Sequence, residues 1–157
     1  MSTLERIQRF SVSRDLLAQT ERALRRAGVE GYELFVLWSG IIDGSELVIR
    51  TCHVPKQTSS KTRRGLMVRV EGQALHELNL WLYEHNEVLA AQVHAHPTHA
   101  FHSDTDDTFP IVTALGGLSL VVPDFARRGV LTAGSAAFRL SRSGWDAVAL
   151  DAIRVLP

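Results

Sequence analysis

The sequence predicts an α/β protein of the α+β type, in which a mixed or mostly antiparallel sheet is flanked by helices. Its 157 residues, 45% of them hydrophobic, suffice for one core and are too few for a second independent domain. The expected strands cluster along the chain instead of alternating strictly with helices, and the pair Gly116-Gly117 is no glycine-rich phosphate loop. Both observations disfavour a doubly wound nucleotide-binding fold. We therefore expect residues 1–157 to form a single domain.

A helix and then a hairpin are expected at the start of the chain. Residues 14–27 repeat leucine and alanine at helical spacing, and Ser13 before them is a suitable helix cap. The apolar runs 34–38 and 46–53 have the composition of strands. The Asp-Gly pair at 43–44 indicates a tight turn between these two strands.

Residues 55–65, PKQTSSKTRRG, are the one stretch with the composition of a linker. The stretch is polar and basic and lacks apolar periodicity, which predicts a mobile surface loop. A strand over residues 66–70 and a second helix over residues 73–84 follow, the helix because its leucines recur with a helical bias.

The second half of the chain is expected to consist mainly of strands. Residues 88–96 alternate as a strand does, and residues 118–122 form an apolar strand that Pro123 ends. Residues 136–141 and 145–150 are expected to pair across a short turn. The three tryptophans lie in apolar-patterned elements and are expected in the core or at a subunit contact: Trp38, Trp81 and Trp145.

Charge and composition exclude several classes of protein. Seventeen Lys and Arg balance seventeen Asp and Glu, so no net charge draws the chain to nucleic acid or to an anionic membrane. Cys52 is the single cysteine and cannot close an internal disulfide, which favours a reducing compartment. The N-terminus has no apolar core, and no run reaches the roughly eighteen apolar residues of a bilayer span. We expect a cytoplasmic protein that binds neither nucleic acid nor membrane.

A cluster of histidines is the clearest chemical signal. Four of the seven histidines fall within nine residues: His94, His96, His99 and His102. Side chains two apart on a strand share a face, so the first two imidazoles point the same way. The loop after Pro97 adds four polar residues close by: Ser103, Asp104, Asp106 and Asp107. Two imidazoles and one carboxylate leave a tetrahedral zinc ion one open position, which is typical of hydrolytic rather than structural sites.

Each of these patterns also has a purely structural interpretation. An isolated His-x-His on a strand is usually a polar edge, and Ser103 to Asp106 could equally cap a helix. Pro110 argues that a helix there would start late, which makes Asp107 the better cap and leaves Asp106 free to reach a metal ion.

Residues 94–107, HAHPTHAFHSDTDD, resemble the zinc-ligand segment of the JAMM (JAB1/MPN/Mov34) metalloproteases, whose pattern is His-x-His-Pro, a short spacer and Ser-x-x-Asp. That family also carries a catalytic glutamate at the start of an early strand that ends in glycine, and residues 33–40 have this form. The likeness extends over residues 5–150 and is closer to the prokaryotic JAB-domain branch. It implies the MPN fold, a curved mixed sheet between helices.

The resemblance also implies a role for each site residue. His94, His96 and Asp106 would bind Zn²⁺, Glu33 would be the general base, and Ser103 would hydrogen-bond the oxyanion of the tetrahedral intermediate. The spacer is one residue shorter than in eukaryotic members, so Asp106 and Asp107 compete as the acidic ligand, and the Ser-x-x-Asp register favours Asp106. His99 and His102 are left as further ligands, supporting donors or solvated loop residues.

The substrate is implied by resemblance alone. It would be an amide or isopeptide bond after the C-terminal tail of a ubiquitin-like protein or its conjugate, with the tail extended beside a sheet edge. Residues 55–65 would be either a flap over that tail or an ordinary disordered loop. Two other functions are alternatives. A non-catalytic MPN scaffold that only binds partners is disfavoured by the intact set of site residues, whereas a zinc amidohydrolase acting on a small or carrier-linked substrate would use the same site.

Overall fold

The structure is a computed structural model that describes residues 4–62, 65–100 and 111–157. Its elements, in chain order, are β1 (Arg9–Ser13), α1 (Arg14–Val29), β2 (Phe35–Asp43), β3 (Glu46–His53), β4 (Gln57–Thr62), β5 (Gly65–Val70), α2 (Gly72–His85), β6 (Val88–Ala95), β7 (Leu118–Val122), the short 3-10 turn η1 (Asp124–Ala126), β8 (Ala136–Ser141), β9 (Gly144–Val148), a second 3-10 turn η2 (Leu150–Ala152) and β10 (Ile153–Leu156).

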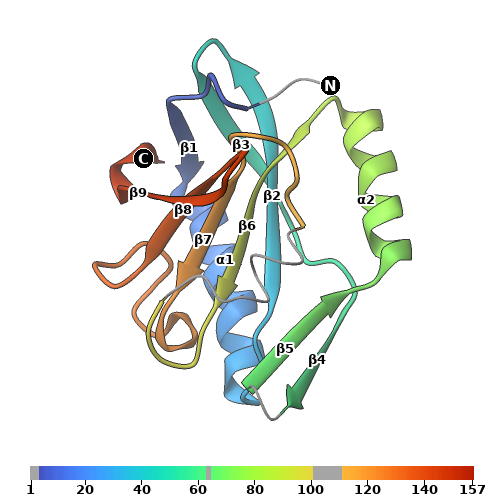
Figure 1. The fold of residues 1–157 in the computed structure, drawn as a ribbon, viewed down its shortest axis with the longest axis vertical. Coiled ribbons are helices and arrows are strands. Elements are labelled where there is room, and N and C mark those ends of the chain that lie inside the picture. Colours follow the sequence, from blue (N-terminus) through green and yellow to red (C-terminus); the bar gives the residue numbers. More distant parts are fainter. Residues whose placement is uncertain (1–3, 63–64, 101–110) are drawn as a thin grey trace.

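Eight of these strands form one mixed sheet in the order β10-β1-β3-β2-β6-β7-β8-β9 (Figure 1). The pairs β1–β10, β1–β3 and β6–β7 are parallel, and the other neighbours are antiparallel. Strands β4 and β5 form a separate hairpin that lies beside the large sheet rather than within it (Figure 1). The predicted fold class, a mixed sheet flanked by helices, is confirmed.

The two helices cover opposite faces of the sheet, as the alternation along β2 shows. Val36 and Trp38 belong to the main core, into which α1 inserts its leucines. Leu37, between them, packs instead against Leu78 and Leu82 of α2. Successive side chains of a strand point to opposite faces, so α1 and α2 lie on different sides. None of the helices in the described part of the chain is long and apolar enough to cross a bilayer.

The largest departure from the sequence prediction is the stretch 55–65. It was expected to be a loop, but β4 occupies most of it and pairs with β5 in register from Gln57↔Val70 to Thr62↔Gly65. A polar strand has no apolar alternation, which is why its composition indicated a loop. Strands β1 and β10 were not predicted, because they are short and pair with each other from opposite ends of the chain.

Gly40 gives a test of how closely β2 and β3 pack. The pairing register of these strands shifts between Ser39 and Gly40, and a Cβ at Gly40 would lie 2.0 Å from the backbone oxygen of Val48. We expect Gly40→Ala to lower the free energy of unfolding by about 1–3 kcal/mol, since the backbone of β3 would have to move. Thermal and urea denaturation measure this. Gly72→Ala is the control, because no atom lies within 4 Å of its added Cβ; equal losses in both variants would contradict the prediction.

His53 gives a pH-dependent prediction. Its Nε2 lies 2.7 Å from Ser39 Oγ, and its ring stands edge-on to Trp81. Burial lowers the pKa of His53; the Glu87 carboxylate opposes this change and His85 adds to it. The unfolded chain, with a histidine pKa of about 6.5, therefore binds the proton more readily than the folded protein. Protonation of His53 therefore leaves the free energy of unfolding unchanged above that pH and lowers it as the pH falls below that value.

We accordingly expect the free energy of unfolding to fall more between pH 7.5 and pH 5.5 in the wild type than in His53→Gln. Urea denaturation of both proteins at the two pH values measures the difference. An identical fall would show that His53 is not responsible.

Candidate metal centre

The pairing of β2 with β6 brings Glu33 and His96 together. Phe35 lies opposite His94, and their rings are 4.7 Å apart between centroids. In an antiparallel pair, two residues back along one strand correspond to two residues forward along the other. Glu33 therefore falls opposite His96, on the same face of the sheet as Phe35 and His94.

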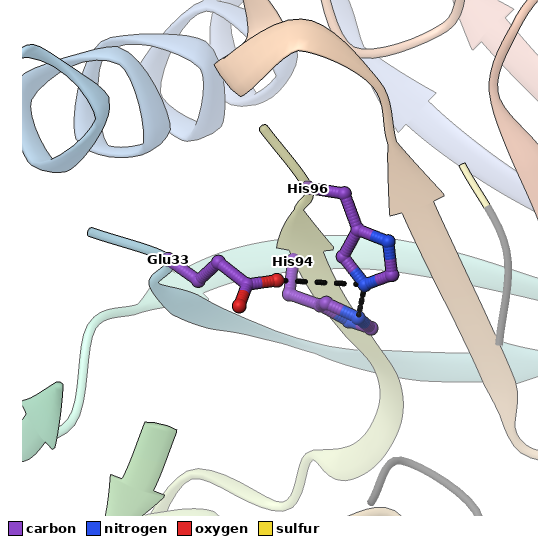
Figure 2. A group of neighbouring side chains, drawn as sticks. All are labelled: Glu33, His94 and His96. Carbon is purple, nitrogen blue, oxygen red and sulfur yellow. Dashed lines mark hydrogen bonds and ion pairs between the residues drawn. The ribbon is translucent and has the colours of Figure 1, made fainter. Parts of the chain in front are cut away.

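The three side chains converge on one point (Figure 2). The Nε2 atoms of His94 and His96 are 3.2 Å apart, and His96 Nε2 lies 3.4 Å from Glu33 Oε1. The exposed fractions of the residues are 2% for His94, 6% for His96 and 9% for Glu33. Such buried imidazoles and carboxylates are rare unless they are paired or hold a metal ion.

The second nitrogen of His96 determines which atom faces the centre. His96 Nδ1 lies 3.3 Å from the backbone oxygen of His99. A carbonyl oxygen only accepts hydrogen bonds, so Nδ1 carries a proton and Nε2 is the ring nitrogen that faces Glu33 and His94. This is the arrangement in which histidine binds metals: one ring nitrogen donates to a carbonyl and the other ligates.

The geometry fits a single small ion. Zinc lies about 2.0–2.1 Å from a histidine nitrogen, so tetrahedral angles separate two such nitrogens by about 3.4 Å. The observed 3.2 Å between His94 Nε2 and His96 Nε2 is close to this value. The cluster of Glu33, His94 and His96 also combines nitrogen and oxygen donors, which suits a divalent transition metal.

Comparison with known proteins agrees with this chemistry. No protein-family model matches the chain. The chain is 40% identical over 149 residues to the probable metalloprotease y4jG of Sinorhizobium fredii. The alignment covers 94% of this chain and 92% of that protein. The chain belongs to this metalloprotease family. The relationship and the buried cluster together support metal-dependent hydrolysis.

A solved structure confirms the fold of this metalloprotease. The solution structure of protein DSY2949 from Desulfitobacterium hafniense superposes with a TM-score of 0.65 and covers 94% of this chain and 92% of that chain. Its sequence is 14% identical, so the likeness concerns the fold alone.

The β4–β5 hairpin holds the backbone from the carbonyl of Glu33 to Phe35. Strand β3 ends at His53, opposite Leu37 of β2. Towards the start of β2, side chains of β4 bond the backbone instead. The Phe35 N–H donates to Gln57 Oε1 at 2.7 Å, and Gln57 Nε2 donates to the Phe35 carbonyl at 2.9 Å. Ser59 Oγ donates to the Glu33 carbonyl at 2.7 Å. The hairpin of the metalloprotease thus satisfies backbone groups that β3 leaves unpaired.

Gln92 anchors the backbone at Ile111 and Val112 to β6. It is fully buried on the same face as His94, and its Oε1 accepts hydrogen bonds from the N–H groups of Ile111 and Val112, each at 3.0 Å. Its Nε2 donates to Ser119 Oγ at 3.3 Å. Ile111 and Val112, the first described residues after the stretch that carries the predicted acidic ligand, are therefore bonded to β6, the strand that carries His94.

The structure brings together three of the five predicted site residues, Glu33, His94 and His96. Ser103 and Asp106 lie outside the described residues, as do His102 and Asp107, and their roles stay predictions. His99 is described: its side chain is exposed, and its backbone oxygen contacts His96. The roles of Glu33 as base and of the histidines as ligands also stay predictions.

Sequence reasoning missed Gln57, Ser59 and Gln92. The first two lie in the stretch predicted to be a loop, although their spacing of two residues is that of one strand face. Gln92 is a lone amide within the apolar strand over residues 88–96. A buried polar side chain in such a run needs hydrogen-bond partners, and that requirement was the available signal.

Proposed function

We propose that this metalloprotease is a zinc-dependent peptidase of the JAMM type that cuts an amide or isopeptide bond after the C-terminal tail of a ubiquitin-like protein. The convergence of Glu33 with His94 and His96 carries the proposal, because the residues come from two motifs far apart in the sequence. Residues 33–40 and 94–107 resemble the two JAMM motifs in the right order. The 40% identical probable metalloprotease supports the reaction class.

His94, His96 and Asp106 are the proposed zinc ligands. The two ends of the segment that carries Asp106 support this choice, since the His99 backbone contacts His96 and Ile111 is bonded to Gln92. A zinc ion bound there would supply Lewis acidity, which lowers the pKa of a ligated water to about 7.

Glu33 is the proposed proton carrier. Its Oε1 faces the point between the histidines, where it can accept a proton from the attacking water and return it to the leaving nitrogen. The water oxygen bonds to the carbonyl carbon, the carbon–nitrogen bond breaks, and the proton leaves on the amine. Ser103 would donate a hydrogen bond to the oxyanion of the tetrahedral intermediate, a contact typically worth about 3 kcal/mol in the transition state.

The β4–β5 hairpin is the proposed docking element for the substrate tail. Gln57 and Ser59 attach β4 to the backbone at Phe35 and Glu33, so the hairpin adjoins the metal centre. An extended peptide can add to such an element through backbone hydrogen bonds. Of the two interpretations of residues 55–65, the flap over a substrate tail is the one that this attachment supports.

Zinc content and cleavage of a ubiquitin-like fusion test the function. We expect one zinc ion per chain and release of the protein fused behind the ubiquitin-like tail. Asp106→Ala should lower both zinc content and cleavage, whereas Asp107→Ala, the neighbouring carboxylate, should retain them. Absence of metal would favour the scaffold function. Bound zinc without cleavage of the fusion, but with hydrolysis of a small or carrier-linked amide, would favour the amidohydrolase.

A further inference from the structure

The backbone after β7 makes an uncommon turn. Three consecutive residues that are not glycine have positive φ: Asp124 at 54°, Phe125 at 50° and Ala126 at 61°. Residues with a Cβ avoid this left-handed region, and those that enter it usually do so singly. Among the described residues, the one other non-glycine with positive φ is Asn86, which ends α2. Such strain persists where the surroundings impose it, and it is concentrated at functional sites.

The turn is bonded to the backbone around His96. The Phe125 N–H donates to the His96 carbonyl at 2.9 Å, and the Asp124 N–H donates to the Thr98 carbonyl at 2.9 Å. The His96 N–H donates to the Val122 carbonyl at 2.8 Å. Strand β6 ends at Ala95 and a proline follows His96, so the turn takes over the pairing where the regular ladder stops.

Helix α1 holds the turn from the other side. Arg25 Nε donates to the Ala126 carbonyl at 2.9 Å, and the same guanidinium donates to the Arg127 carbonyl. At Gly28 an added Cβ would lie 2.5 Å from the Cβ of Phe125, so helix and turn are in direct contact there. The two carbonyls and the close approach define where the turn sits relative to α1.

His94 is held differently. It lies inside β6, opposite Phe35 of β2 and Val121 of β7, so a strand flanks it on both sides. A displacement of the turn should therefore move His96 and leave His94 in place.

We propose that Arg25 is a positioning residue: it does not contact the metal centre itself but acts on it through the turn. Through the left-handed turn Asp124–Ala126, α1 sets the backbone of His96 and hence the position of its imidazole relative to His94 and Glu33. This inference rests on the proposed function for its consequence, metal affinity, but its structural part concerns the metal-free protein.

The experiment compares Arg25→Ala and Gly28→Ala with the wild type. The control is Glu21→Gln, which removes the ion pair of Arg25 at 2.7 Å and leaves its bonds to the turn. The imidazole NMR signals of the metal-free proteins report the positions of the two rings, and competition with a chromophoric chelator gives the zinc affinity. We expect Arg25→Ala and Gly28→Ala to shift the His96 signals, and to shift the His94 signals less, because only the contact of that ring with His96 changes. Zinc binding should weaken about 10–100-fold, as on loss of a residue that supports a ligand.

Two further results support or overturn the inference. Arg25→Lys keeps a donor at this position and should restore part of the affinity, whereas Glu21→Gln should match the wild type. A lower melting temperature in Arg25→Ala with unchanged His96 signals and zinc affinity would overturn it, because Arg25 would then be only structural. Should Arg25→Ala fail to fold, Gly28→Ala decides in the same way, since alanine favours the helix.

Failure of the proposed function gives a different result. If the wild type binds no zinc, the metal centre is wrong, while the His96 and His94 signals of the metal-free variants still show whether α1 positions the ring. Unchanged His96 signals in both variants would overturn the inference regardless of metal binding.

Discussion

Glu33→Gln is expected to abolish hydrolysis and to leave zinc bound. The glutamine has nearly the shape of the glutamate but cannot accept a proton at neutral pH, so the loss should be that of a general base, about 10²–10⁴-fold in kcat. The side chain would keep its place, because the hairpin holds the backbone of Glu33 through Ser59. Zinc content and kcat, measured on the same preparation, check both parts of the prediction.

Two outcomes would contradict this role. Full activity in Glu33→Gln would eliminate Glu33 as the base. Loss of zinc would instead make Glu33 a ligand, which its Oε1 position 3.4 Å from His96 Nε2 permits geometrically. Glu84→Gln is the matched control, since it makes the same change on the exposed surface of α2 and should alter neither quantity.

Local patterns in the sequence were enough for much of the sheet. The strands over 46–53, 118–122 and 136–141 have the predicted bounds, because each is an apolar or alternating run with clear ends. The convergence of His94 and His96 followed from strand alternation alone. Glu33 was added by resemblance, and its place opposite His96 follows from the register of β2 with β6.

What could not be predicted depends on contacts between distant segments. Strands β1 and β10 pair from the two ends of the chain, and nothing local in either indicates the other. Strand β4 is polar, and it bonds Phe35 and Glu33 in a region of the backbone that β3 does not reach. The left-handed turn at Asp124–Ala126 contains no glycine, the residue that usually indicates positive φ.

These contacts explain how three side chains from two distant segments can be held in place around one centre. His94 is held by strand pairing on both sides, Glu33 by the hairpin, and His96 by the turn after β7. A metal site needs ligands held close to their final geometry, because ordering them at the moment of binding costs free energy. The parts that sequence patterns did not reveal are thus the supports, whereas the groups that would do the chemistry were recognisable.

His94→Ala is expected to remove the metal centre. The substitution deletes one of two imidazoles whose Nε2 atoms lie 3.2 Å apart, leaving too few ligands on this face. Zinc affinity should fall by more than about 100-fold, since residues that merely support a ligand already account for about 10–100-fold. Hydrolysis should be lost with it. Chelator competition and zinc content measure the first effect, and cleavage of the fusion measures the second.

His99→Ala is the matched control for that prediction, because it removes a histidine of the same cluster whose side chain is exposed. The contact of His99 with His96 uses its backbone oxygen, which alanine retains. The variant should therefore bind zinc as the wild type does. Equal loss of zinc in both variants would make the His99 ring a ligand, and retention in both would exclude the His94–His96 pair as the metal centre.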